Sequence, residues 1–286
     1  MGTRLQKPVE ELTFADDGMF QAVLRDPAIC AELVELLLGV QVDHVDYPAL
    51  EKAIEPFYTT KGVRLDVYLK DKNKVIDVEL QSYEQKALGK RMRYYEAMLD
   101  MDALMKGEDY ENLKESYIVF ICKYDPFIDE NKKPFGLPRY TFSNICTENN
   151  LVNLDDKSLK VVYNSTAFEA EKDERIKALL RFVQTNETGQ DDFSNRLNAL
   201  VEKMKENEKF RRDYAAMNLH DRDIRKAAKE EGLAEGAQQK AVEAAVNLLK
   251  MNKLSPEEIA QAQGLSLELV QELADNLAAQ RAPAQA

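Results

Sequence analysis

GVRLDVYLKDKNKVIDVELQ, residues 62–81, is the stretch that decides the fold of the core. Apolar residues alternate with polar ones on both sides of a short polar turn, which predicts two half-buried strands joined as an antiparallel hairpin. Opposed residues share a face, so the two apolar sets meet only if Asp66 faces an odd-numbered partner such as Asp77 or Glu79. The pattern therefore places Asp66, Glu79 and Gln81 on one face.

Two acids on neighbouring strands can hold a hard cation between them. Opposed or diagonal residues of such a pair lie about 5 to 8 Å apart, so Asp66 and Glu79 can reach one divalent ion from both sides. Mg²⁺ prefers oxygen ligands, and Mn²⁺ or Ca²⁺ accept the same ligand types. Such an ion lowers the pKa of bound water and offsets charge that develops on an attacked phosphate.

The alternative interpretation is that these acids form the solvated face of an ordinary hairpin. Two features speak against it. Aspartate is poorly suited to strands, and a cluster of Asp66, Asp77 and Glu79 is electrostatically costly unless a cation or Arg64 relieves it.

The first 165 residues mix expected helices and strands. Asp26 and Pro27 are typical of a helix start, and Gly39 is typical of a helix end. We expect helices at 13–24, 27–39 and 83–105, and further strands at 117–122, 140–142 and 159–163. From residue 169 onward the pattern is almost wholly helical. The sequence therefore predicts an α/β fold, a small mixed sheet flanked by helices, with an all-helical C-terminal region.

The predicted organisation has five parts. They are the core at 1–165, a helical extension at 166–229 packed on or beside it, a charged glycine-containing linker at 230–240, a small helical region at 241–278 and a disordered tail at 279–286. Two short helices at 255–277 resemble a helix-turn-helix. Residues 266–277 contain no Lys or Arg, however, so we expect helical packing or self-association there rather than DNA reading.

Composition excludes several classes of protein. The longest apolar run, residues 33–40, is broken by Glu35 and is far too short to span a membrane. No apolar stretch follows the basic residues of the N-terminus, so we expect no secretory signal. Three cysteines without a CxxC pair and two distant histidines argue against disulfides and against a thiolate or histidine metal centre. The prediction is a cytoplasmic protein whose metal, if any, has oxygen ligands.

The net charge of −12 is unfavourable for binding nucleic acid, since phosphates are neutralised by Lys and Arg. The charge is uneven, however. Residues 61–93 contain nine basic and five acidic residues. This local excess predicts phosphate contact that is weak and sensitive to salt.

Several longer motifs carry a family resemblance. They are GVRLDVYL (62–69), VIDVELQ (75–81), KRMRYYEAML (90–99), PRYTFSNICTEN (138–149), EEGLAEGAQQKA (230–241) and LSPEEIAQAQGLSLELV (254–270). Together they resemble the Rpn-type recombination-promoting nuclease or putative transposase family, a branch of the PD-(D/E)XK nucleases. The resemblance extends over essentially the whole chain and is far more specific than a lone D…ExK match. It implies a PD-(D/E)XK restriction-endonuclease-like core and a divalent-metal-dependent DNA endonuclease linked to recombination or mobile elements, with Mg²⁺ as the default ion.

The resemblance assigns roles to individual residues. Asp66 and Glu79 match the two acidic metal ligands, and the backbone carbonyl of Leu80 matches the usual third ligand. Gln81 stands where most PD-(D/E)XK enzymes have lysine, a departure typical of this branch. Glutamine can orient a water or a phosphate oxygen but carries no charge, so another cation must help, and Arg91 is the candidate.

Further residues are expected around this centre. Asp17 matches an acidic residue on the family's first helix and would contact the metal through water, although Gln21 replaces the lysine that commonly follows. Tyr95 is expected to pack in the core. The expected contacts with DNA phosphates are Arg64, Lys86, Lys90, Arg93 and Tyr94.

Three questions stay open at this point. Cutting both strands would favour a homodimer, because one site cuts one strand. An RNA substrate is not distinguished from DNA, since no RNA-binding motif is identified. A catalytically degenerate fold that acts as a binding or assembly module is the alternative function, which the acidic charge and the missing lysine favour.

Overall fold

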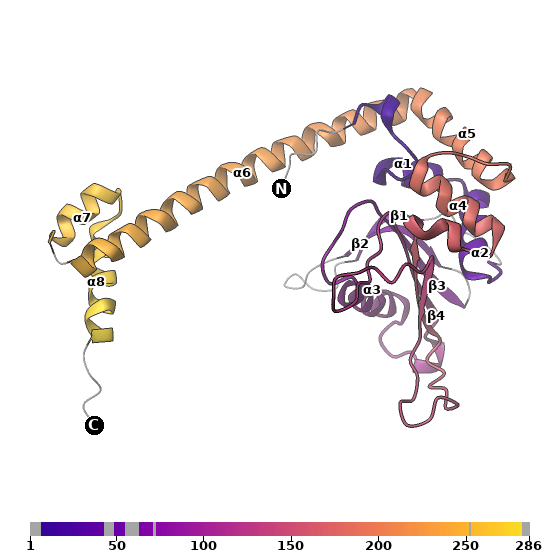
Figure 1. Cartoon of the computed structure of the whole chain (residues 1–286), viewed down its shortest axis with the longest axis horizontal. Helices are drawn as coiled ribbons and strands as arrows, with labels where there is room; N and C mark the ends of the chain where they lie inside the picture. Colours follow the sequence, from indigo (N-terminus) through magenta and orange to yellow (C-terminus); the bar gives the residue numbers. More distant parts are fainter. Residues whose placement is uncertain (1–6, 43–48, 55–62, 71–72, 252, 282–286) are drawn as a thin grey trace. The chain divides into compact units, whose positions relative to one another are not determined.

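The computed structural model describes residues 7–42, 49–54, 63–70, 73–251 and 253–281, with the backbone alone at 49–54, 63–64, 217–235 and 278–281. The chain divides into two compact units, Met1–Tyr214 and Ala215–Ala286. The first unit contains the sheet, and the second is helical (Figure 1). No helix within the described ranges combines the length and apolar character that crossing a membrane requires.

A six-stranded mixed sheet forms the centre of the first unit, with the strand order β1-β2-β3-β4-β6-β5. The strands are β1 (Ala49–Ile54), β2 (Val63–Lys70), β3 (Lys74–Gln81), β4 (Glu115–Cys122), β5 (Arg139–Phe142) and β6 (Ser158–Asn164). β3, β4 and β6 run parallel, while β1, β2 and β5 join antiparallel. The α/β arrangement expected from the sequence is confirmed.

The central strand β4 is buried on both faces, as its nearly continuous apolar sequence predicts. Val119 and Ile121 face one core cluster, and Ile118 and Phe120 face the other. Its neighbours β3 and β6 are both parallel to it, and their last residues, Gln81 and Asn164, both pair in register with Cys122 at the end of β4.

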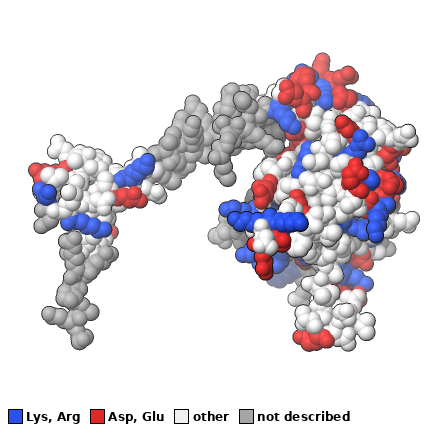
Figure 2. Space-filling model, viewed as in Figure 1, with Lys and Arg blue, Asp and Glu red and all other residues white. Residues whose placement is uncertain are grey.

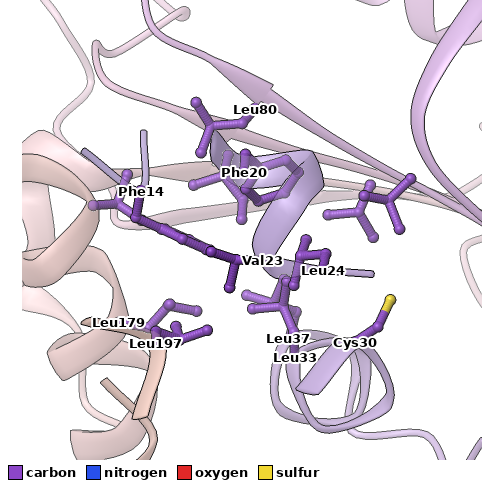
Figure 3. Close-up of a cluster of buried hydrophobic side chains, with 14 of the residues drawn as sticks. Phe14, Phe20, Val23, Leu24, Cys30, Leu33, Leu37, Leu80, Leu179 and Leu197 are labelled. Atoms are coloured by element: carbon purple, nitrogen blue, oxygen red, sulfur yellow. The ribbon is translucent and has the colours of Figure 1, made fainter. Parts of the chain in front are cut away.

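Four helices cover one face of the sheet: α1 (Asp17–Val23), α2 (Pro27–Leu38), α4 (Glu174–Thr185) and α5 (Asp192–Glu206). Figure 3 shows Phe14, Phe20 and Leu80 among the side chains of this cluster. The start of α2 is capped by the Asp26 carboxylate, which accepts hydrogen bonds from two backbone amides, and Gly39 ends it with a φ of 67°. This confirms both boundaries predicted for α2.

The helix α3 (Leu88–Ala103) packs on the opposite face (Figure 1). Met92, Tyr95 and Leu99 lie on its buried side, against Phe120 and other residues of the second cluster. The helix begins five residues later than the sequence suggested, and its N-terminal flank, residues 82–87, forms a turn beside the end of β3.

The second unit contains most of α6 (Glu208–Met251), together with α7 (Pro256–Gln263) and α8 (Leu267–Arg281). Its small core is built from Ala245, Ile259, Ala260 and Val270. Ser255 forms a capping box with Glu258 at the start of α7.

The segment at 230–240, predicted as a charged glycine-containing linker, is helical, because α6 runs through it. Its two glycines each cost about 1 kcal/mol relative to alanine, but the surrounding Ala, Glu, Leu, Gln and Lys residues are strong helix formers. The strand β1, which forms the edge beside β2, was not predicted.

Candidate active site

The hairpin of β2 and β3 brings the two predicted acids together. Val67 pairs with Val78 and Tyr68 pairs with Asp77, so continuing this register by one residue sets Asp66 opposite Glu79. The backbone amide of Asp66 donates a hydrogen bond of 2.8 Å to Oε1 of Glu79. The amide of Leu80 donates one of 3.2 Å to Oδ2 of Asp66. Each carboxylate is thus held by the backbone of the opposite strand.

Gln81 lies at the end of β3 on the same face as Glu79 and is only 6% exposed. Its Nε2 donates a hydrogen bond of 3.2 Å to the carbonyl of Leu80. Its Oε1 accepts one of 2.9 Å from Nη1 of Arg91. The Gln81 amide therefore connects the Leu80 carbonyl, which is the expected third metal ligand, to the guanidinium of Arg91.

Arg91 reaches this centre from the first turn of α3. Its Nη2 donates a hydrogen bond and forms a salt bridge of 3.0 Å with Oε2 of Glu79, which is 1% exposed. The same guanidinium also donates to Oε1 of Gln85 and to the hydroxyl of Tyr95. The geometry thus joins Arg91 directly to Glu79, whereas the sequence suggested Arg91 only because of its charge.

Two residues beside the acids were not assigned to the site from the sequence. Gln21 on α1 donates from Nε2 to Oδ1 of Asp66 at 3.3 Å, and Gln85 in the turn before α3 binds Arg91 at 2.6 Å. Gln21, which replaces the lysine common in the family, thus contacts the carboxylate of Asp66. No short sequence pattern signals Gln85, because its place depends on how the turn packs on the sheet.

Burial and mutual repulsion raise the pKa values of the acids. Desolvation, followed by the charge of Asp66, raises the pKa of Glu79 to about 8. Desolvation is also the largest cause for Asp66, whose pKa rises to about 6, and the charge of Asp17 adds to the effect. Asp17 acts on both acids through its charge, which fits its expected place near them. Its side chain is exposed at the start of α1.

Asp77 lies two residues before Glu79 on β3, so its side chain is on the same face of the strand. It is fully buried, and neither of its carboxylate oxygens has a hydrogen-bond partner within the described part of the chain. Desolvation, and then the charges of Glu79 and Asp66, raise its pKa well above the usual range. Arg91 is the cation whose charge opposes this effect.

The donor set fits a hard divalent cation. Asp66, Glu79 and the Leu80 carbonyl supply oxygen atoms, and every oxygen that already accepts a hydrogen bond keeps a second lone pair. Among the described side chains, one guanidinium stands against three acids, so this part of the centre is short of positive charge. Among the described residues, however, no group of three or more Asp, Glu, His or Cys side chains is arranged around a common point. Any bound ion would therefore complete its coordination with water or substrate.

The expected phosphate contacts lie on the exposed side of α3 and of the turn that precedes it. Lys86, Lys90, Arg93 and Tyr94 are exposed. Arg64 belongs to β2, but its side chain lies outside the described residues. Figure 2 shows basic and acidic side chains interspersed over the visible face of the first unit. No described residue forms a salt bridge with Lys86, Lys90 or Arg93, so these three charges are available to a polyanion.

A family model described as PD-(D/E)XK nuclease family transposase matches residues 26–231. Searches of curated proteins and of solved structures return no match. The matched span includes the acids, Gln81 and α3, but it leaves out Asp17, α7 and α8. The resemblance suggested over essentially the whole chain therefore holds for this central part. Since that part is well over half of the sequence, the chain belongs to the PD-(D/E)XK nuclease family transposases.

Proposed function

We propose that this protein is a divalent-metal-dependent DNA endonuclease that hydrolyses phosphodiester bonds, with a role in DNA recombination or mobile elements. The observation that carries the proposal is the interlocked pair Asp66 and Glu79, each bound to the opposite strand's backbone, within the span that a nuclease family model matches. Mg²⁺ is the proposed ion, and Mn²⁺ or Ca²⁺ suit the same oxygen donors.

Each residue of the centre has a separate task. Asp66, Glu79 and the Leu80 carbonyl would hold the ion, which when bound supplies Lewis acidity at the scissile phosphate. Gln81, whose Nε2 lies against that carbonyl, would orient a water or a phosphate oxygen. Arg91 lowers the electrostatic cost of gathering the carboxylates.

The substrate would approach from the exposed side of α3. Lys86, Lys90 and Arg93 would contact phosphates there, and Tyr94 would add a hydroxyl contact. These contacts position the duplex without reading its sequence. A homodimer would place two such centres on opposite strands, which double-strand cutting needs.

The experiment that tests this function follows nicking of supercoiled plasmid DNA in Mg²⁺, Mn²⁺ and Ca²⁺. We expect Asp66→Asn and Glu79→Gln each to lower the rate by about 100-fold or more, because each removes an ionic ligand while keeping the side chain's size. Glu32→Gln is the matched control, because this carboxylate binds arginines of α4 and α5 away from the site. Full nicking by both site variants, with unchanged circular dichroism spectra, would refute the assignment.

A second candidate function is a non-catalytic binding or assembly module. The salt bridge between Arg91 and Glu79 favours it, because a resident cation already satisfies one of the two acids. Isothermal titration calorimetry with Mg²⁺ and Mn²⁺ separates the two candidates. A nuclease centre binds the ion with an affinity that Glu79→Gln lowers, whereas a degenerate centre gives no heat that depends on Glu79.

A further inference from the structure

The guanidinium of Arg91 uses all of its hydrogen-bonding capacity inside the protein. An arginine has five N–H donors in a rigid plane. In this structure Nη1 donates to Gln81 and Gln85, Nη2 donates to Glu79 and Tyr95, and Nε donates to Tyr95. With five hydrogen bonds in place, no donor remains for a DNA phosphate. Arg91 therefore acts on the reaction through Glu79 and Gln81.

The hydroxyl of Tyr95 accepts two of these five bonds, at 3.0 Å from Nε and 2.9 Å from Nη2. Arg91 and Tyr95 are four residues apart on α3, a spacing that puts them on one face of a helix. The guanidinium also lies 5.0 Å from the ring centroid of Tyr95 and 5.3 Å from that of Phe120. Phe120 pairs in register with Glu79, so the rings of Tyr95 and Phe120 and the carboxylate of Glu79 lie around the guanidinium of Arg91.

These contacts fix the direction in which the guanidinium points. The two donors bound to Tyr95 share one edge of the planar guanidinium, which leaves the donors on its other edges for Glu79, Gln81 and Gln85. Tyr95 itself is 8% exposed and packs against Phe120, with ring centroids 6.1 Å apart. Its hydroxyl oxygen accepts two hydrogen bonds from Arg91, so Tyr95 is placed to act on the site through this arginine.

We propose that Tyr95 is a positioning residue, whose hydroxyl aims the Arg91 guanidinium so that it bridges Glu79 and Gln81 in the geometry needed for cleavage. The proposal rests on the nuclease function proposed above and adds a residue that was expected to serve only in core packing. Removing the hydroxyl would leave two guanidinium donors without an acceptor, and the arginine would turn away from the acid and the amide to satisfy them.

The test compares Tyr95→Phe with the unchanged full-length protein. Partners that orient a metal ligand typically contribute 10- to 100-fold to activity or metal affinity. We therefore expect kcat for plasmid nicking to fall by about 10-fold or more, while KM for DNA stays the same because Tyr95 does not contact DNA. Calorimetry with Mn²⁺ should show weaker binding, since Glu79 loses its fixed orientation.

Tyr140→Phe is the matched control. Tyr140 belongs to the same hydrophobic cluster and is similarly buried, but its hydroxyl binds Asp125 rather than the active-site arginine. It should leave kcat and the Mn²⁺ titration unchanged. If Tyr95→Phe melts at a lower temperature than this control, the kinetics are compared where circular dichroism shows both variants folded.

A double-mutant cycle with Arg91→Lys tests whether Tyr95 acts through the arginine. Lysine lacks the planar set of donors, so the double variant should be no slower than Arg91→Lys alone. Additive losses, an unchanged kcat in Tyr95→Phe, or a raised KM with normal kcat would each overturn the positioning role while leaving the nuclease function intact. A wild-type protein that neither nicks DNA nor binds the ion would instead refute the nuclease function, and this inference with it.

Discussion

In the proposed nuclease, Gln81 and Arg91 together take the place of the lysine found in most PD-(D/E)XK motifs. The amide lies at the end of β3 and the charge comes from α3, with 2.9 Å between Oε1 of Gln81 and Nη1 of Arg91. The two side chains are complementary, because the amide oxygen of Gln81 accepts a hydrogen bond that the guanidinium of Arg91 donates. A lysine at position 81 would instead place a second positive charge against the arginine.

We therefore predict that Gln81→Lys, although it restores the common motif, lowers the nicking rate by about 10-fold or more. Like charges at this distance repel, and Arg91 loses one of its acceptors. The measurement is the rate of plasmid nicking in Mg²⁺ at saturating DNA. A rate equal to or above that of the wild type would show that the arginine does not replace the lysine.

The double variant Gln81→Lys with Arg91→Gln serves as the control for this prediction. It exchanges the charge and the amide between the two positions, so the repulsion is absent. We expect it to recover part of the activity that Gln81→Lys alone loses. Recovery would show that the loss comes from the pair of charges rather than from the size of the new side chain.

The placement of Asp66 and Glu79 on one face was predictable, because a period of two fixes which residues of a hairpin share a face. The register of β2 and β3 confirms this placement. The role of Tyr95 was not predictable, since its aromatic ring suits a core position equally well. Helical spacing alone puts Tyr95 beside Arg91, but only the packing of α3 on the sheet brings this arginine to Glu79 and Gln81. The catalytic roles of all these residues remain predictions.

Among the helices and strands, those with strong periodicity or caps were predictable. β4 is a continuous apolar run, and α2 has Asp26 and Gly39 at its ends. β1, with the sequence ALEKAI, was missed because an edge strand with charged residues has no clear alternation. The helical conformation of residues 230–240 was not predicted, because two glycines were given more weight than the many helix formers around them.

α3 has two sides with different tasks, since Arg91 points to the acids while Lys90 and Arg93 are exposed. A lysine that contacts a phosphate contributes about one unit to the slope of log affinity against log salt. We predict that Lys90→Ala, made in the Glu79→Gln background to slow cutting, weakens binding to a short duplex roughly threefold at moderate salt and lowers this slope by about one.

Fluorescence anisotropy across a salt series with Ca²⁺ present measures both quantities. Lys172→Ala, at an exposed lysine beside the start of α4, should change neither. An unchanged slope in Lys90→Ala would remove Lys90 from the DNA surface, while the assignment of the acids would stand.

The protein as a whole loses stability by gathering three acids around one arginine. Their folded-state pKa values lie above the ordinary ones, from 4.5 to about 8 for Glu79 and from 3.8 to about 6 for Asp66, with Asp77 also raised. A raised acid pKa means that folding favours the protonated form. The contribution of the protonated acids to folding stability is therefore complete at low pH. It is lost as the pH rises through their folded-state pKa values.

We accordingly predict that the metal-free protein, in EDTA, melts at a progressively lower temperature between about pH 5 and pH 8. Asp77→Asn removes one of the three titrating groups at a fully buried position that has no hydrogen-bond partner among the described residues. Relative to the wild type, its melting temperature should rise by roughly 2–4 °C or more between pH 5 and pH 8, because folding raises the pKa of the carboxyl that the substitution removes. This difference corresponds to about 1 kcal/mol in a domain of this size. Mg²⁺ should reduce the pH dependence of the wild type, because a bound cation stabilises the ionised acids. If the two curves stay parallel from pH 5 to pH 8, Asp77 does not carry this buried charge.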